Sequence, residues 1–277
     1  MIRVEIPTKI GLKIGAKGNE VNKLQGYLKR IGFIRPDEEA SYGVKIDLSR
    51  TTKQPKPNIF DATTQEALRH FQEFYKLPVS GKLDKATVNL MLQPRCGVPD
   101  LIESAGGQDY VYSGYKWTKL NLTYQIENFT TDFSEDIAKR AIKDAFDQWS
   151  SKTPLNFTNV TSGADIKLSW GTGNHDNCRP FDGPSGELAH AFFPQDGRVH
   201  FDDDELWTDT LISLGKDFAS VALHELGHTL GLGHSNDPFA VMFPFFIARR
   251  RSLSQDDIAG IQSIYGANEH RGNAGWW

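Results

Sequence analysis

The segment that most constrains the fold of this chain is residues 223–234, LHELGHTLGLGH. His224 and His228 are four residues apart on a predicted helix, so both side chains lie on one helical face and reach one metal ion. Gly231 can end that helix by adopting a positive φ angle, which other residues disfavour. The bend would bring His234 round as a third ligand. Three imidazoles with one open coordination position are what catalytic zinc requires.

Glu225 follows the first of these histidines, where its carboxylate can contact a water molecule on the metal. The alternative is an amphipathic helix that carries three histidines and no metal. Chance disfavours this alternative, because each fixed residue of the pattern has odds of about 1 in 20. Three of the 8 histidines of the chain also fall within this one segment. The segment therefore predicts a zinc site.

Three stretches together resemble the matrix metalloproteinases, which are the matrixins of the metzincin clan. HELGHTLGLGH resembles the metzincin signature, and residues 240–244 (AVMFP) resemble the Met-turn, which would place Met242 beneath the zinc. Residues 251–266 resemble the last helix of the family. On its own, Met242 would be read as core filling. The resemblance covers residues 19–266 and implies a metzincin catalytic domain.

The resemblance implies a zinc-dependent endopeptidase that hydrolyses internal peptide bonds of proteins with a metal-activated water. Zinc lowers the pKa of its bound water towards about 7, and Glu225 would act as the general base. Pro244 and Phe246 would line the wall of the main specificity pocket. The family has Tyr at the position of Phe246, and an apolar residue is expected after the scissile bond.

The chain has 2 cysteines, Cys96 and Cys178. Residues 94–100, PRCGVPD, resemble the cysteine switch of the family. Zinc deprotonates a coordinating thiol, so Cys96 would occupy the position of the catalytic water and keep the enzyme latent. Arg95 and Asp100 are expected to pair and hold this loop. The alternatives are a buried free cysteine and a disulfide between the two cysteines.

Residues 173–193 resemble the structural zinc and calcium segment of the family. Three histidines match its structural zinc ligands: His175, His190 and His200. The family has Asp as the fourth ligand, where this chain has Asn177. A neutral amide is a weak ligand, so Asp176, if the loop adjusts, and Cys178 are alternatives for the fourth position. A polar loop without metal also stays open.

The same resemblance implies at least one calcium site. Three carboxylates match it: Asp182, Asp202 and Glu205. Three backbone carbonyls would complete the site, those of Gly183, Ser185 and Glu187. Hard oxygen ligands in this number suit calcium. The alternative for residues 202–205 is a solvated acidic turn.

Apolar periodicity predicts an α+β chain in two parts. Three short amphipathic helices are expected first, beginning near Asn19, Asp61 and Asp84, and they resemble a peptidoglycan-binding module. Strands and helices alternate after that, with strands at 120–126, 164–170, 188–193 and 198–201 and helices at 134–150, 216–230 and 254–265. The family implies a twisted, mostly parallel, five-stranded sheet with three helices. The expected domains are an all-α prodomain (1–107), a catalytic domain (108–268) and a tail (269–277).

Net charge and hydropathy exclude some partners. The net charge of −4 gives no basic excess for nucleic acid. No run approaches the roughly 20 apolar residues that span a membrane. The start, MIRVEIPTKI, shows no signal peptide, although the family implies a secreted, extracellular protein. A minimal form without a hemopexin domain is expected, as a monomer whose partners are protein or peptide substrates and its own prodomain.

Two other functions stay open at this stage. In the first, the helical module binds cell-wall glycan and the metal domain is a passenger, but intact Glu225 and three histidines argue against an inactive domain. In the second, the chain is a zinc amidase that cuts wall cross-links. The Met-turn and the switch motif would not be expected in such an amidase. Hydrolysis of a peptide substrate discriminates both from an endopeptidase.

Overall fold

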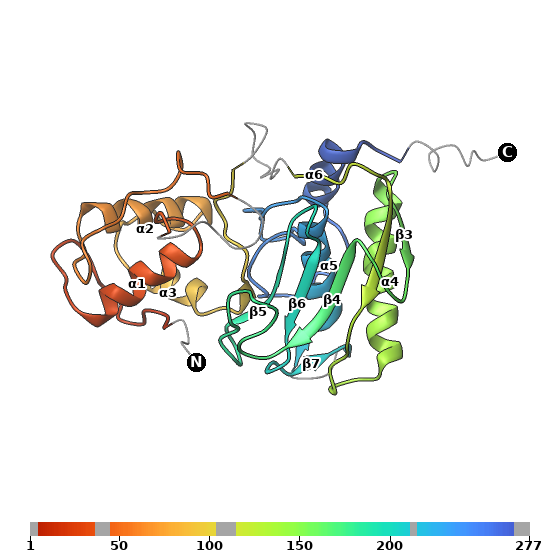
Figure 1. Ribbon diagram of the computed structural model, residues 1–277. Helices are drawn as coiled ribbons and strands as arrows, with labels where there is room; N and C mark the ends of the chain where they lie inside the picture. Colours follow the sequence, from red (N-terminus) through yellow and green to blue (C-terminus); the bar gives the residue numbers. More distant parts are fainter. Residues whose placement is uncertain (1–4, 37–44, 104–114, 211–214, 269–277) are drawn as a thin grey trace.

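The computed structural model describes residues 5–36, 45–103, 115–210 and 215–268. A group of three helices forms one side of the molecule, and a sheet with three further helices forms the other (Figure 1). This α+β arrangement is the fold class expected from the sequence. The expected boundary at residue 107 and the tail from residue 269 lie outside the described residues. Within the described ranges, no helix has the length and apolarity that a membrane span needs.

The helical part consists of α1 (Asn19–Arg30), α2 (Ala62–Phe74) and α3 (Lys85–Met91). Asp61 and Asp84 cap the second and third helices, because their carboxylates accept hydrogen bonds from Thr64 N and Thr87 N, both at 2.9 Å. The apolar faces meet in one cluster whose largest buried side chains include Phe33, Phe60 and Phe71. The three predicted helices are confirmed.

The main sheet has six strands in the order β1-β5-β6-β4-β2-β3. Their bounds are β1 Arg95–Cys96, β2 Asn121–Ile126, β3 Asn156–Asn159, β4 Ile166–Gly171, β5 Glu187–Ala191 and β6 Arg198–Asp202. All neighbours are parallel except β5 and β6, which are antiparallel. Without β1, this is the five-stranded, mostly parallel sheet that was expected. Two short strands, β7 (Trp207–Thr208) and β8 (Lys216–Asp217), form a separate pair.

The other three helices are α4 (Glu135–Lys152), α5 (Phe218–Thr229) and α6 (Gln255–Tyr265). The core between α4, α5 and the sheet contains four aromatic side chains that are nearly or fully buried: Phe146, Trp149, Phe201 and Phe218. Trp149 Nε1 donates to Leu223 O at 3.1 Å and so fixes α4 against α5. This bond and the shared core position α5, which carries His224 and His228.

Strand β1 joins the helical part to the sheet part, because it pairs with β5 at the edge of the sheet. Arg95 N donates to Gly186 O at 3.0 Å and Gly97 N donates to Ala189 O at 2.9 Å, so β1 lengthens the sheet beyond β5. On its other side, Cys96 N donates to Pro244 O at 2.9 Å. The segment therefore lies between two extended backbones and fills the space between them.

Candidate metal centres and the switch segment

Helix α5 carries His224 and His228 on one face, and the turn after the helix places His234 beside them. Asp217 caps the helix, because its carboxylate accepts from Ser220 N at 3.2 Å. The chain turns at Gly231, whose φ is +102° and where a Cβ atom would lie 2.3 Å from Tyr115 O. Only glycine fits this turn. The turn returns the chain so that His234 faces the helix, as the sequence predicted.

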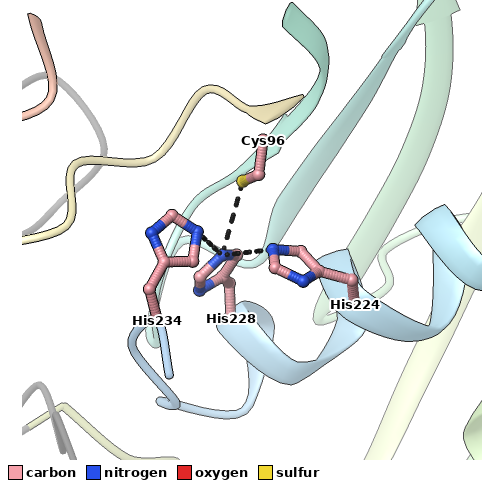
Figure 2. Close-up of side chains that lie close together, drawn as sticks. All are labelled: Cys96, His224, His228 and His234. Carbon is pink, nitrogen blue, oxygen red and sulfur yellow. Dashed lines mark hydrogen bonds between the residues drawn. The ribbon is translucent and has the colours of Figure 1, made fainter. Parts of the chain in front are cut away.

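The three imidazoles have the spacing of zinc ligands (Figure 2). His228 Nε2 lies 3.1 Å from the Nε2 atoms of both His224 and His234. Cys96 Sγ lies 3.4 Å from His228 Nε2 on the open side. Ligands at about 2.0–2.3 Å from zinc lie about 3.3–3.7 Å apart in a tetrahedron. All four atoms lie within 4.8 Å of one another, so the residues fit one zinc ion.

Each imidazole is oriented by a partner at Nδ1. His224 Nδ1 contacts Val241 O and His228 Nδ1 contacts Leu232 O, both at 2.7 Å. His234 Nδ1 contacts Asp100 Oδ1 at 2.8 Å. These partners place the proton on Nδ1 and leave Nε2 free for metal. Burial lowers the pKa of all three imidazoles, so they are neutral, which is the form that binds metal.

Glu225 lies beside this cluster on α5. It is fully buried, and neither carboxylate oxygen accepts a hydrogen bond from the described residues. Burial raises its pKa well above the ordinary value, and Glu187 adds to the effect. A buried carboxylate without a partner is costly. A nearby metal cation and a water molecule would relieve that cost, and this fits the general base that the sequence predicted.

Met242 and Phe246 both lie beside the candidate zinc ligands of α5. Met242 Sδ would be 2.4 Å from a Cβ atom on Gly227, so the turn packs against the helix between the two ligands. The ring of Phe246 lies 5.4 Å from that of His224. Beside it is a cavity of about 260 Å³ whose lining includes Leu188, Val221 and Phe246. Pro244 accepts the hydrogen bond from β1 described above.

Residues 94–100, called the switch segment from here on, are held by a buried ion pair. Arg95 Nη2 lies 2.6 Å from Asp100 Oδ1, and Tyr75 Oη donates to Asp100 Oδ2 at 2.6 Å. A Cβ atom on Gly97 would lie 1.9 Å from a Glu187 carboxylate oxygen, so glycine permits the close approach. Burial raises the pKa of the Cys96 thiol well above its ordinary value. Both cysteines are free, so the disulfide alternative is not seen.

Two protein-family models match the sequence of this chain. The family described as Matrixin matches residues 116–266, and the family described as a putative peptidoglycan binding domain matches residues 17–91. The chain belongs to the matrixin family. Matrixins use catalytic and structural zinc together with calcium, in agreement with the histidine and cysteine clusters.

Matrixin relatives are similar over most of this chain. The interstitial collagenase of Sus scrofa is 43% identical over 256 residues, which are 91% of this chain and 50% of that protein. The neutrophil collagenase of Homo sapiens is 40% identical over 264 residues, 93% of this chain and 52% of that protein. Matrix metalloproteinase-C of Caenorhabditis elegans is 40% identical over 272 residues, 91% and 45%. The chain thus spans about half the length of these curated relatives.

This matrixin has a second cluster of ligand atoms beside the sheet edge. It consists of four residues: His175, Cys178, His190 and His200. His190 Nε2 lies 3.4 Å from His175 Nε2 and 3.1 Å from His200 Nδ1. The three predicted histidines are thus brought together. Asn177 is exposed, and the fourth ligand atom of the cluster is the sulfur of the next residue, Cys178.

The predicted calcium site contains one buried carboxylate oxygen without a partner in the described part of the chain, whereas Asp182 Oδ1 accepts from Glu187 N at 2.8 Å. Asp202 Oδ2 is buried and accepts no hydrogen bond from the described residues. Burial raises the pKa of Asp202 to about 7, and the charges of Asp204, Glu205 and Asp182 add to this. Glu205 Oε1 accepts from Ser185 N at 2.5 Å. The unpartnered oxygen of Asp202 fits a calcium ion, although the three carboxylates are less tightly grouped than the two clusters with histidine.

Sequence reasoning missed one group of charges around Glu187. Only its backbone carbonyl was predicted to act, at calcium. Its buried carboxylate instead contacts Arg30 of α1, Arg179 at 3.3 Å and His190 Nδ1 at 2.6 Å. Arg30 and Arg179 hold the pKa of Glu187 well below its usual range despite burial. No spacing in the sequence announces this group, because Arg30 lies 157 residues away.

Proposed function

We propose that this matrixin is a latent zinc endopeptidase that cuts internal peptide bonds of extracellular proteins. One observation carries the proposal. His228 Nε2 lies 3.1 Å from the Nε2 atoms of both His224 and His234, and Glu225 lies beside these three imidazoles without a hydrogen bond from the described residues. Family membership and the extracellular setting implied by the names of the collagenase relatives agree with it.

In this proposal, the three histidines hold the zinc ion and Glu225 transfers the proton. Zinc bound by His224, His228 and His234 would lower the pKa of water and polarise a substrate carbonyl. The Glu225 carboxylate accepts a proton from the attacking water and passes it to the leaving amine. Its burial favours this role, because a raised pKa brings a carboxylate closer to the pKa of the groups it exchanges protons with.

The sheet edge supplies the substrate site. In the latent chain, Ala189 O of β5 accepts a hydrogen bond from the switch segment. When that segment leaves, the edge is free to pair with an extended peptide. The cavity beside Phe246 would then receive an apolar side chain next to the scissile bond.

Latency follows from the position of Cys96. Its sulfur lies 3.4 Å from His228 Nε2, on the side where a water or a substrate carbonyl would have to enter (Figure 2). Its backbone N–H donates a hydrogen bond to Pro244 O, and that of the neighbouring Gly97 donates to Ala189 O of β5. A thiolate would occupy the fourth coordination position of zinc and so exclude the catalytic water. Removal of the helical part, by cleavage between residues 101 and 116, would release both blocks. Most of that segment lies outside the described residues.

The test uses a quenched fluorescent peptide with an apolar residue after the scissile bond. The full chain is compared before and after limited proteolysis, alongside Cys96→Ser and Glu225→Ala. We expect slow hydrolysis by the untreated chain and much faster hydrolysis after proteolysis. Cys96→Ser should be active without treatment, and Glu225→Ala should lose activity by a factor of about 100–10,000.

A chelator should abolish the activity and added zinc should restore it. If zinc is bound and no form hydrolyses the peptide, the endopeptidase proposal fails and glycan binding or amide hydrolysis in cell walls gains support. If the untreated chain is as active as the treated one, the enzyme stands but the latency does not. The two parts of the proposal are thus tested separately.

A further inference from the structure

The second cluster differs from the ligand set that the family resemblance implied. That set contains three histidines and an Asp, and the position of the Asp is Asn177 here. In the structure, Cys178 Sγ lies 3.0 Å from His175 Nε2, 3.3 Å from His190 Nε2 and 3.4 Å from His200 Nδ1. The sulfur therefore contacts all three imidazole nitrogens that face the centre.

We propose that this centre binds zinc through three histidines and the Cys178 thiolate, which replaces the expected carboxylate. The spacing supports it, because sulfur at about 2.3 Å and nitrogen at about 2.0 Å from zinc lie about 3.5 Å apart in a tetrahedron. The inference does not depend on the endopeptidase activity proposed above.

The backbone explains why the ligand moves by one residue. Asp176 and Asn177 both adopt positive φ angles, +39° and +52°. This left-handed pair forms a tight turn in which Cys178 N donates to His175 O at 3.1 Å. Both side chains of the turn are exposed, and Cys178 follows it on the inner side. Asn and Asp tolerate the left-handed region better than most residues, so the turn suits this sequence.

The charges around the centre also favour a thiolate. Asp176 Oδ2 lies 2.8 Å from Arg198 Nη1 and 3.3 Å from His200 Nε2, so it orients a histidine from outside. Glu187 does the same for His190 while pairing with two arginines. Both carboxylates already balance a cation. A neutral amide would leave the full charge of the zinc uncompensated near these arginines, whereas a thiolate removes one unit of it.

The outer contacts of the cluster are those of a metal site. His175 Nδ1 contacts Gly173 O at 2.8 Å and His190 Nδ1 contacts Glu187 Oε1 at 2.6 Å. Each histidine therefore has one nitrogen facing the sulfur and the other held by an oxygen. An oxygen partner on the ring nitrogen that faces away from the metal is typical of zinc-bound imidazoles.

A thiolate has chemical consequences that a carboxylate lacks. It selects softer metals such as cadmium, and it reacts with thiol reagents. Cys178 is partly exposed, whereas Cys96 is fully buried. A mercurial added to the latent chain would therefore reach the second centre as well as the switch. Activation by such a reagent would not report on Cys96 alone.

The test is cobalt(II) absorption, because only a thiolate ligand adds a strong charge-transfer band in the near ultraviolet. The full chain carries Cys96→Ser, which removes the other thiolate, and Glu225→Ala, which prevents self-digestion. This reference chain is compared with versions that also carry Asn177→Ala or Cys178→Asp. Cobalt per chain, circular dichroism and the band are measured for each.

We expect the reference chain to bind two cobalt ions and to show the band, with no change in the Asn177→Ala version. The Cys178→Asp version should keep both ions and its fold, because the charge of the ligand is conserved. It should lose the band, because the sulfur ligand is gone. A reference chain with two ions and no band would overturn the proposal, as would loss of one ion in the Asn177→Ala version. These two chains decide the question even if Cys178→Asp does not fold.

Discussion

Three buried carboxylates show how the nearest charge decides the behaviour of a residue in this fold. Burial alone would raise the pKa of Asp100, yet Arg95 and His234 hold it below the usual value. Asp202 is buried among other carboxylates, and its pKa rises to about 7. Glu225 is buried and accepts no hydrogen bond from the described residues, although the nearby Cys96 thiol opposes the rise of its pKa. These surroundings suit Asp100 to a salt bridge, and they agree with the proposed roles of Asp202 at calcium and of Glu225 in proton transfer.

The raised pKa of Asp202 makes the stability of the calcium-free protein depend on pH. The folded pKa of about 7 exceeds the ordinary value of 3.8. The folded state therefore binds this proton more tightly than the unfolded state. The stabilisation is fully present below the ordinary value and is lost as pH rises through the folded pKa. We expect Tm to fall between about pH 4 and pH 7 without calcium and to change little above that range.

Calcium should remove this effect, because a cation compensates the ionised carboxylates. Thermal unfolding of the Glu225→Ala chain with and without calcium should show a larger rise in Tm at the higher pH. Asp202→Asn should reduce both the pH dependence and the calcium response. An equal calcium response at both pH values would contradict this account of the site.

At the scale of elements, α6 and the Met-turn are joined by one side chain. Asp257 forms a capping box with Ser254 at the start of α6. Its two carboxylate oxygens also accept from Val241 N at 2.8 Å and Met242 N at 3.0 Å. A helix cap thereby fixes the turn that lies under the zinc-binding helix.

Replacement of Asp257 should destabilise the fold more than replacement of its neighbour. Asp257→Ala leaves two buried backbone donors unsatisfied, which costs about 1–3 kcal/mol per group. Asp256→Ala also removes a charge from the same helix end, so it controls for the helix dipole. Urea unfolding of both in the Glu225→Ala background measures the difference. Equal losses for the two variants would show that the turn does not depend on Asp257.

Elements with a long apolar period could be predicted, and elements that depend on a neighbour could not. Helix α4 was expected at 134–150 and runs from Glu135 to Lys152, because its apolar face repeats over several turns. Strand β3 was missed, because in Asn156–Asn159 only Phe157 is apolar and partly buried. Strand β1 has two residues and exists because β5 offers an open edge.

The same distinction applies to the sites. The cluster of His224, His228 and His234 follows the period of one helix and one glycine turn, so spacing was sufficient to predict which residues meet. The sequence also predicted the three histidines of the second cluster, but it left Asn177, Asp176 and Cys178 open for the fourth position. Two left-handed residues, Asp176 and Asn177, turn the chain so that Cys178 faces inward, and no period of the sequence encodes such a turn. The group around Glu187 joins separate parts of the chain and was also beyond reach.

At the scale of the whole molecule, three groups of contacts among the described residues join the helical part to the sheet part. The switch segment pairs with β5, as described above. Tyr75 packs its ring 5.1 Å from Phe245 and 5.8 Å from Phe243, so the helical core extends into the other part. Arg30 of α1 forms an ion pair with buried Glu187. The first two are spread over many atoms, but the third can be removed by a single substitution.

Arg30→Met should therefore loosen the latent state and leave the catalytic part intact. Glu187 keeps Arg179 and His190 as partners, so its charge stays compensated. A hydrogen bond between charged groups contributes about 1.5–3 kcal/mol, which corresponds to about a 10- to 100-fold rise in the open fraction. The measurement is the initial rate of peptide hydrolysis by the untreated chain, divided by the rate after the helical part is removed.

Lys23→Met is the matched control, because this residue lies on the same helix and pairs with Glu20 at 2.8 Å within the helical part. It removes the same charge without touching the sheet part. The control should therefore leave the rate of the untreated chain unchanged, while both treated variants should be as active as the parent. If Arg30→Met behaves like Lys23→Met, the helical part is held by the switch segment and the aromatic cluster alone, and the ion pair serves only to compensate Glu187.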